Sequence, residues 1–126
     1  MAEHHQNLRK FNRSVFNPII KLFAGRFIYA LVQHTGRTSG KEYTTPVVAA
    51  IKEGTIFIPL PYGADTDWFL NVQAKGGCMV TLRGKQYAAA TPIMVDPAAA
   101  LPAFSQLLRR AFKRAEISQF LRLSVV

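Results

Sequence analysis

The stretch that decides the fold is YTTPVVAAIKEGTIFIPL, residues 43–60. It holds two runs of apolar and β-branched residues, 43–52 and 55–60, separated only by Glu53-Gly54. A dipeptide of this kind between two such runs is typical of a tight hairpin turn. The second run is apolar without alternation, as expected of a strand buried on both faces. The stretch therefore predicts an antiparallel hairpin with one strand inside the protein.

The residues on the N-terminal side of this hairpin predict a third strand. The segment FIYALVQ, residues 27–33, is rich in aromatic and aliphatic residues, which favour extended structure. The turn TGRTSGK, residues 35–41, joins it to the hairpin. Strands joined by short connections pair with one another, so these three strands predict an antiparallel meander.

The residues on the C-terminal side predict a helix and then a second hairpin. Asp65 or Thr66 can cap a helix over 67–75, which Gly76 and Gly77 end. We expect a loop over 61–65 before this helix and two more extended segments after it, over 78–83 and 86–95. A further helix, opened by Asp96-Pro97, is expected over 98–114. The type of the apolar tail, residues 117–126, is left open.

Together these elements predict a mainly β protein, with about six short antiparallel strands in a small barrel and helices outside it. The 126 residues fit a single domain, and 49% hydrophobic against 18% charged residues excludes a disordered chain. Cys78 is the only cysteine, which excludes an intrachain disulfide and a cysteine zinc site. We therefore expect a cytoplasmic protein.

The net charge of +9 is concentrated in two segments. Residues 1–26 and 109–122 each hold five cations against one glutamate, whereas the residues between them are nearly neutral. In the first segment the cations alternate with apolar residues at helical spacing, which predicts a basic amphipathic helical segment over 7–24, interrupted at Asn17-Pro18. It either packs on the protein's own core or lies on anionic lipid, in peripheral contact with the inner face of the membrane. No apolar stretch reaches the ~20 residues of a membrane span.

Several function classes find no support in the sequence. The pI of about 10.2 fits nucleic-acid binding, but no predicted strand presents the aromatic platform that stacks bases, so we expect no nucleic-acid partner. His4, His5 and His34 have no partner at metal-ligand spacing, so no metal site is predicted. No catalytic triad or carboxylate pair is recognisable, and no catalytic residue is assigned. If the protein is an enzyme, a cofactor supplies the chemistry.

Two blocks carry candidate site residues. The turn 35–41 gathers two glycines, three hydroxyls and two cations, which can face one anion together with backbone N–H groups. It is not a nucleotide-triphosphate loop, because only three residues separate Gly36 from Gly40. The second block holds Trp68 and Asn71, which can line a flat aromatic pocket. The alternatives are an ordinary polar turn and a tryptophan that fills the core.

These blocks resemble the deazaflavin-dependent nitroreductase-like oxidoreductases, split-barrel proteins related to the pyridoxamine-phosphate-oxidase-like flavoproteins. The resemblance covers about residues 34–82 and rests on Thr35-Gly36-Arg37-x-Ser39-Gly40-Lys41, Thr45-Pro46 and Trp68-x-x-Asn71-x-x-Ala74. It implies binding of coenzyme F420 and hydride transfer to a lipophilic acceptor, such as a quinone, an enone or an unsaturated acyl chain. The residues implied for the phosphate and the glutamate tail are Arg37, Thr38, Ser39, Gly40 and Lys41, and Thr45 and Pro46 continue along the groove. Those implied for the ring are Pro61, Tyr62, Gly63, Trp68 and Asn71.

The sequence departs from the family at Thr38 and Tyr43, where members tend to carry cations, so flavin mononucleotide (FMN) stays open as the cofactor. Tyr62 and Tyr43 are both candidates to donate a proton. The alternatives to a deazaflavin reductase are an FMN- or haem-binding split-barrel protein and a non-enzymatic, membrane-associated carrier of a lipid or fatty acid. In either case the C-terminal tail, with Phe112, Phe120, Leu121 and Leu123, is a candidate to close an apolar pocket. The oligomeric state, monomer or homodimer, is also open.

Overall fold

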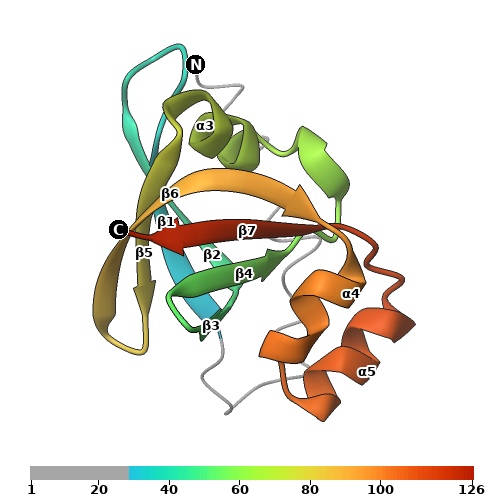
Figure 1. The fold of residues 1–126 in the computed structure, drawn as a ribbon. Coiled ribbons are helices and arrows are strands. Elements are labelled where there is room, and N and C mark those ends of the chain that lie inside the picture. The colour runs from blue at the N-terminus through green and yellow to red at the C-terminus, as the bar shows by residue number, and fades with distance from the viewer. Residues whose placement is uncertain (1–28) are drawn as a thin grey trace.

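The computed structural model describes residues 29–126, which form one seven-stranded antiparallel sheet with short helices around it (Figure 1). The strands are β1 (Tyr29–Thr35), β2 (Glu42–Val48), β3 (Ala50–Lys52), β4 (Thr55–Pro59), β5 (Gly77–Leu82), β6 (Lys85–Val95) and β7 (Phe120–Val125). The helical elements are η2 (Gly63–Asp65), α3 (Asp67–Lys75), α4 (Pro97–Ala100), η3 (Leu101–Ala103) and α5 (Gln106–Arg114). The predicted basic segment 7–24 lies outside the described residues, so its membrane contact stays a prediction.

The sheet curls into a half-barrel. Its strand order is β2-β1-β5-β6-β7-β4-β3, so β2 and β3 stand at the two ends of the order. Only Ala49 separates these two strands in the chain, and Ala49 is buried. One nearly continuous run of residues therefore pairs with β1 at one end of the sheet and with β4 at the other, which forces the sheet to bend round on itself. The predicted class, a mainly β barrel with peripheral helices, is confirmed.

The C-terminal tail supplies the seventh strand, which the sequence did not specify. β7 lies between β6 and β4 in the middle of the sheet, and its Phe120, Leu121 and Leu123 are fully buried. Leu121 and Leu123 belong to the main core, whereas Phe120 packs with Phe112 in a second cluster. The idea that these four side chains close a substrate pocket is therefore wrong, because Leu121 and Leu123 fill the main core, and Phe112 and Phe120 fill the cluster between the strands and α5.

The single helix predicted over 98–114 is also wrong, since the structure has α4, η3 and α5 in its place. Pro102 has no backbone N–H to continue a helix, and Ser105 starts a new one by accepting a hydrogen bond from Leu108 N at 3.3 Å. Arg109 Nε donates to the carbonyl oxygens of Leu101 and Phe104, at 2.8 and 2.9 Å. These hydrogen bonds stabilise the chain where the helix is interrupted, between η3 and α5.

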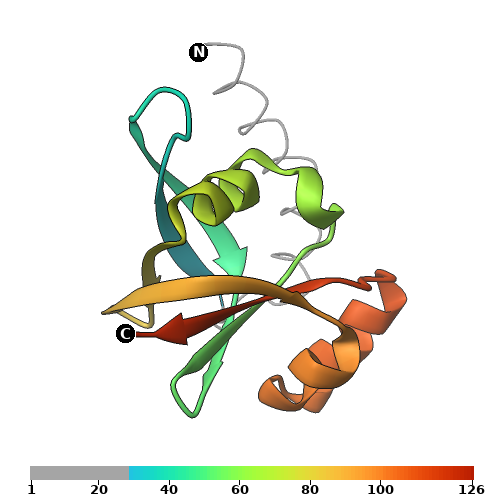
Figure 2. The same ribbon diagram turned by 45° about the horizontal axis from the view of Figure 1, so that its top comes forward.

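Helix α3 has the predicted bounds, with Thr66 at its N-cap position and Gly76 at its end. In both views α3 lies on one side of the strands, and α4 and α5 lie on another (Figures 1 and 2). Among the described helices, none is both long and apolar enough to cross a membrane.

Candidate functional site

The turn between β1 and β2 is closed by its own backbone. Gly36 N donates to Lys41 O at 2.7 Å, and Gly40 N donates to Gly36 O at 3.0 Å. A Cβ atom at Gly36 would collide with the Ser39 hydroxyl and would press on the Tyr43 ring. The close approach of these side chains therefore favours glycine at 36.

A buried polar network connects this turn to α3. Asn71 Oδ1 accepts hydrogen bonds from the backbone N of Arg37 at 3.0 Å and from its Nη1 at 2.7 Å. Asn71 Nδ2 lies 3.1 Å from His34 Nδ1, and His34 Nε2 lies 2.9 Å from Thr45 Oγ1. Asn71, His34 and Thr45 are each at most 2% exposed. One side chain of α3 thus holds the turn, β1 and β2 together.

The donors in this network fix its proton positions. Arg37 has no acceptor, so the atom of Asn71 that faces it is the amide oxygen, and the amide nitrogen must donate to His34. His34 Nδ1 is then an acceptor, and the ring is the neutral tautomer whose Nε2–H donates to Thr45. Sequence reasoning left His34 without a role. His34 alternates along β1 with the buried residues Ala30 and Val32, and this pattern indicates that His34 is buried too. No neighbouring residue in the sequence indicates its hydrogen-bond partner.

The Arg37 guanidinium is partly committed to the protein. Its Nη2 lies 3.4 Å from Asp67 Oδ1, and its Nη1 lies 3.5 Å from Asp67 O, while the Arg37 side chain stays 31% exposed. Asp67 is the first residue of α3, so this contact brings the turn next to the start of the helix. Arg37 therefore both braces the turn and keeps one side open to solvent.

The other turn residues surround Arg37 at the surface. Thr38, Gly40 and Lys41 are exposed, whereas Ser39 is half-buried. Ser39 Oγ accepts from Lys41 N at 3.2 Å and lies 3.5 Å from the Tyr43 hydroxyl. The exposed groups of residues 37–41 are thus two cations, one hydroxyl and backbone, a set that suits an anion. The exposed Glu42 carboxylate lies next to them and accepts a hydrogen bond from the Thr35 hydroxyl at 2.9 Å.

The residues predicted to flank a flat ring separate into two layers. Pro61 and Tyr62 are exposed, Tyr62 at 47%, and Gly63 is half-buried with a positive φ of 77°. Trp68 is only 3% exposed and packs edge-on against Phe69 in the main core, at 6.2 Å between ring centroids. Asn71 is fully buried in the network described above, and Pro46 is half-buried in β2. Trp68 and Asn71 therefore lie in the interior, whereas Pro61 and Tyr62 lie at the surface.

Thr66 is a further residue at this site that sequence analysis treated only as a helix cap. Its side chain makes no capping hydrogen bond, and its Oγ1 is buried without a hydrogen-bond partner in the described part of the chain. A buried hydroxyl without a partner costs free energy, so such atoms are often found where a ligand or water binds. Thr66 adjoins Asp67, the residue that Arg37 contacts.

Two other kinds of chemistry find no support in this region. Burial raises the pKa of the Cys78 thiol to about 12, so it is protonated at neutral pH and is a poor nucleophile. Within residues 29–126, no cluster of three or more His, Cys, Asp or Glu side chains is placed to hold a metal ion.

Known proteins show the same fold at low sequence identity. No protein-family model and no curated protein matches the sequence. A solved chain described as a domain-swapped dimer is 17% identical, with a TM-score of 0.58 over 92% of this chain and 98% of that one. A putative pyridoxamine 5'-phosphate oxidase from Listeria innocua is 6% identical, with a TM-score of 0.56 over 86% and 91%. An F420-H2 dependent reductase is 15% identical, with a TM-score of 0.47 over 77% and 94%.

These similarities establish a split barrel like that of pyridoxamine-phosphate oxidases, as the sequence predicted. At identities of 17% and below, they show the fold and leave the activity to be argued from the site itself.

Proposed function

We propose that this protein is an oxidoreductase that binds coenzyme F420 at the β1–β2 turn and transfers a hydride to a lipophilic acceptor. The observation that carries the proposal is the pair of hydrogen bonds from Arg37 to Asn71, at 3.0 and 2.7 Å. These bonds fix the exposed turn, the proposed anion site, against α3. A preorganised turn binds an anion without first losing conformational entropy.

The residues present fit the anionic part of the cofactor. Arg37 and Lys41 offer cations, and Thr38 and Ser39 offer hydroxyls, so a phosphate and a carboxylate tail find complementary groups on one turn. The unpaired Thr66 hydroxyl supplies a further group nearby. In this proposal the deazaflavin ring lies on loop 61–63, which Trp68 supports from the core.

When bound, the reduced deazaflavin supplies the hydride. The chain then has to orient two flat molecules and to provide a proton to the reduced acceptor. Tyr43 is buried, its ring stacks on His34, and its hydroxyl lies 3.5 Å from Ser39. Tyr62 is 47% exposed on the loop, so we assign the proton donation to the Tyr62 hydroxyl.

Binding of the cofactor is the first test. Trp68 is the only tryptophan, so its fluorescence reports ligands at this end of the barrel. We expect coenzyme F420 to quench it at micromolar concentration and FMN to need about tenfold more, because the glutamate tail adds anionic groups that FMN lacks. Preferential quenching by FMN would assign the site to a flavin, and no quenching by either would contradict the proposal.

A pair of variants locates the site. Lys41→Gln removes an exposed cation from the turn, and we expect it to weaken F420 binding by about tenfold at low salt. Lys75→Gln removes an exposed cation at the other end of α3 and is expected to leave the affinity unchanged. Equal affinities of the two variants would show that the tail does not bind at the turn.

A further inference from the structure

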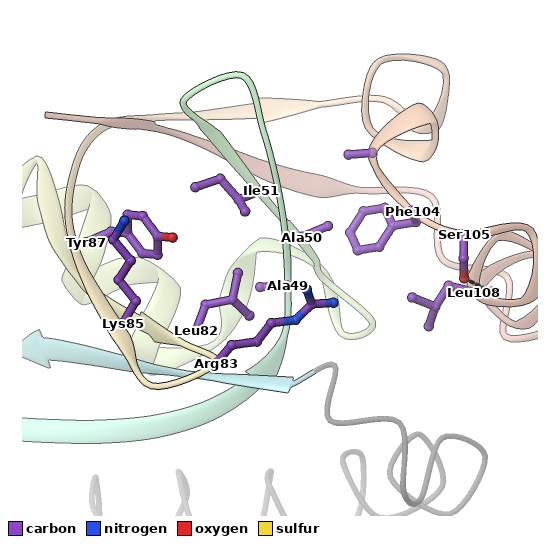
Figure 3. Close-up of a pocket in the computed structure, with 11 residues that line it drawn as sticks. Ala49, Ala50, Ile51, Leu82, Arg83, Lys85, Tyr87, Phe104, Ser105 and Leu108 are labelled. Atoms are coloured by element: carbon purple, nitrogen blue, oxygen red, sulfur yellow. Dashed lines mark hydrogen bonds between the residues drawn. The ribbon is translucent and has the colours of Figure 1, made fainter.

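A cavity opens beside the β5–β6 hairpin, with a volume of about 390 Å³ (Figure 3). Three segments enclose it, namely the bend between β2 and β3, the hairpin, and the chain from η3 to α5. Its lining residues are Ala49, Ala50, Ile51, Leu82, Arg83, Lys85, Tyr87, Ala103, Phe104, Ser105 and Leu108. The volume lies at the lower end of the range for small-molecule pockets.

This cavity is separate from the β1–β2 turn. In the pairing of β1 with β5, Leu31 faces Thr81, which adjoins the lining residue Leu82. The turn begins beyond Thr35, at the other end of β1. The four residues from Leu31 to Thr35 extend about 13 Å along a strand. The cavity and the proposed cofactor turn therefore lie toward opposite ends of β1, and they share no lining residue.

The walls of the cavity differ in chemistry. The β2–β3 bend and the helical segment contribute mostly alanine, aliphatic side chains and the Phe104 ring. The hairpin contributes Arg83 and Lys85, and among residues 29–126 no acidic side chain lines the cavity. Lys85 Nζ lies 5.4 Å from the centre of the Tyr87 ring. An apolar space with two cations and two aromatic rings at its walls is complementary to a ligand that is aromatic and anionic.

Arg83 is the residue most available to such a ligand. In Figure 3 its side chain extends from the hairpin into the space between Leu82 and Phe104. Over the described residues it has no hydrogen bond and no ion pair. A guanidinium binds a carboxylate through two parallel N–H···O bonds, and such bonds strengthen where apolar walls exclude water.

We propose that this cavity is a second binding site and that it takes a small aromatic carboxylate. The aromatic body lies against Phe104 and the alanines of the β2–β3 bend, and the carboxylate pairs with Arg83, with Lys85 nearby. This proposal does not depend on coenzyme F420, because it uses other residues at the other end of β1.

The test uses a matched pair of ligands in titration calorimetry with the full chain. The first is 2-naphthoate, and the second is 2-naphthamide, which has the same ring system without the charge. We expect submillimolar binding of 2-naphthoate and at least tenfold weaker binding of the amide, because hydrogen bonds to a charged group are the stronger ones. Equal affinities, or no binding of 2-naphthoate at millimolar concentration, would overturn the proposal.

A matched pair of variants assigns the binding to Arg83. Arg83 and Glu53 both have positive φ, 53° and 51°, and each precedes a glycine at a hairpin tip. Asparagine is favoured at such positions, so Arg83→Asn and Glu53→Asn should both fold at least as well as the parent. We expect only Arg83→Asn to weaken 2-naphthoate binding, by at least tenfold. Unchanged affinity of Arg83→Asn would overturn the assignment.

A third variant tests the apolar wall. Ala103→Trp places an indole at the half-buried Ala103 position in the lining and should abolish binding of both ligands. Its F420 affinity should match that of the parent when both are measured by titration calorimetry, because the added indole fluoresces together with Trp68; a match separates this site from the turn. Retained 2-naphthoate affinity in Ala103→Trp would show that the ligand binds outside the cavity.

Discussion

Two arginines at opposite ends of β1 show how differently one residue type can be used. Arg37 lies in the β1–β2 turn, where Asn71 and Asp67 accept its hydrogen bonds, so its guanidinium is largely occupied by contacts within the protein. Arg83 sits at the tip of the β5–β6 hairpin, and the described structure gives it no such partner. Arg37 thus chiefly makes structural hydrogen bonds, whereas no described hydrogen bond or ion pair occupies the Arg83 guanidinium, which our proposal assigns to a ligand.

The largest expected effect comes from the residue on which Arg37 depends. Asn71→Leu keeps a side chain of similar size but leaves His34 Nδ1 and the Arg37 N–H groups without their partner. We expect the free energy of unfolding to fall by about 3 kcal/mol, because several buried hydrogen bonds are lost at once. Urea denaturation measures it, with Gln73→Leu, an exposed position on the same helix, as control. A loss below about 0.5 kcal/mol would show that the network is dispensable.

The two arginines can be compared directly by the same substitution. Arg37→Met removes the side-chain donors to Asn71 and Asp67, while the backbone N–H of residue 37 still donates to Asn71, and should lower the free energy of unfolding by about 1.5 kcal/mol. Arg83→Met removes no described hydrogen bond and should change it by about 0.5 kcal/mol or less. Thermal and urea unfolding of the two variants, measured side by side, give the difference. Equal losses would break the distinction between a structural and an available arginine.

The smallest effect concerns Cys78, which lies in β5. Its pKa is raised to about 12 by burial, whereas the unfolded thiol ionises near its ordinary value of 9.0. Above pH 9 the unfolded state therefore holds fewer protons than the folded state, so this residue lowers stability as pH rises toward 12. We expect Cys78→Ala to lose less stability than the parent over that interval. A thiol reagent at pH 8 should react more slowly with the half-buried Cys78 of the folded protein than with the unfolded chain in denaturant, and equal labelling rates would contradict its burial.

Much of the fold was predictable because it depends on neighbours in the chain. Glu53-Gly54 marks a hairpin turn by itself, and the residues from Thr66 to Gly76 carry the start and end signals of α3. The helix predicted over 98–114 was broken by Pro102, a residue that does carry a local signal. β7 was not specified, because its pairing with β4 joins residues about 65 positions apart.

The candidate site follows the same rule. The two glycines of the β1–β2 turn indicated a tight loop, and a loop closed by its own backbone hydrogen bonds is present, whereas anion binding there stays a prediction. The network beneath it was not predicted, since His34 and Asn71 are 37 residues apart and meet only when α3 packs on β1. The unpaired hydroxyl of Thr66 has no sequence signal, because threonine at an N-cap normally uses that hydroxyl itself.

The position of β7 has a consequence for synthesis of the protein. β7 fills the gap between β6 and β4, so neither strand has its second partner until residues 120–125 have left the ribosome. Until then the nascent chain carries two open strand edges, the arrangement that pairs most readily with a second chain. A chain released before Phe120 should therefore self-associate during translation, and a chaperone that covers strand edges at that stage would raise the yield of folded protein.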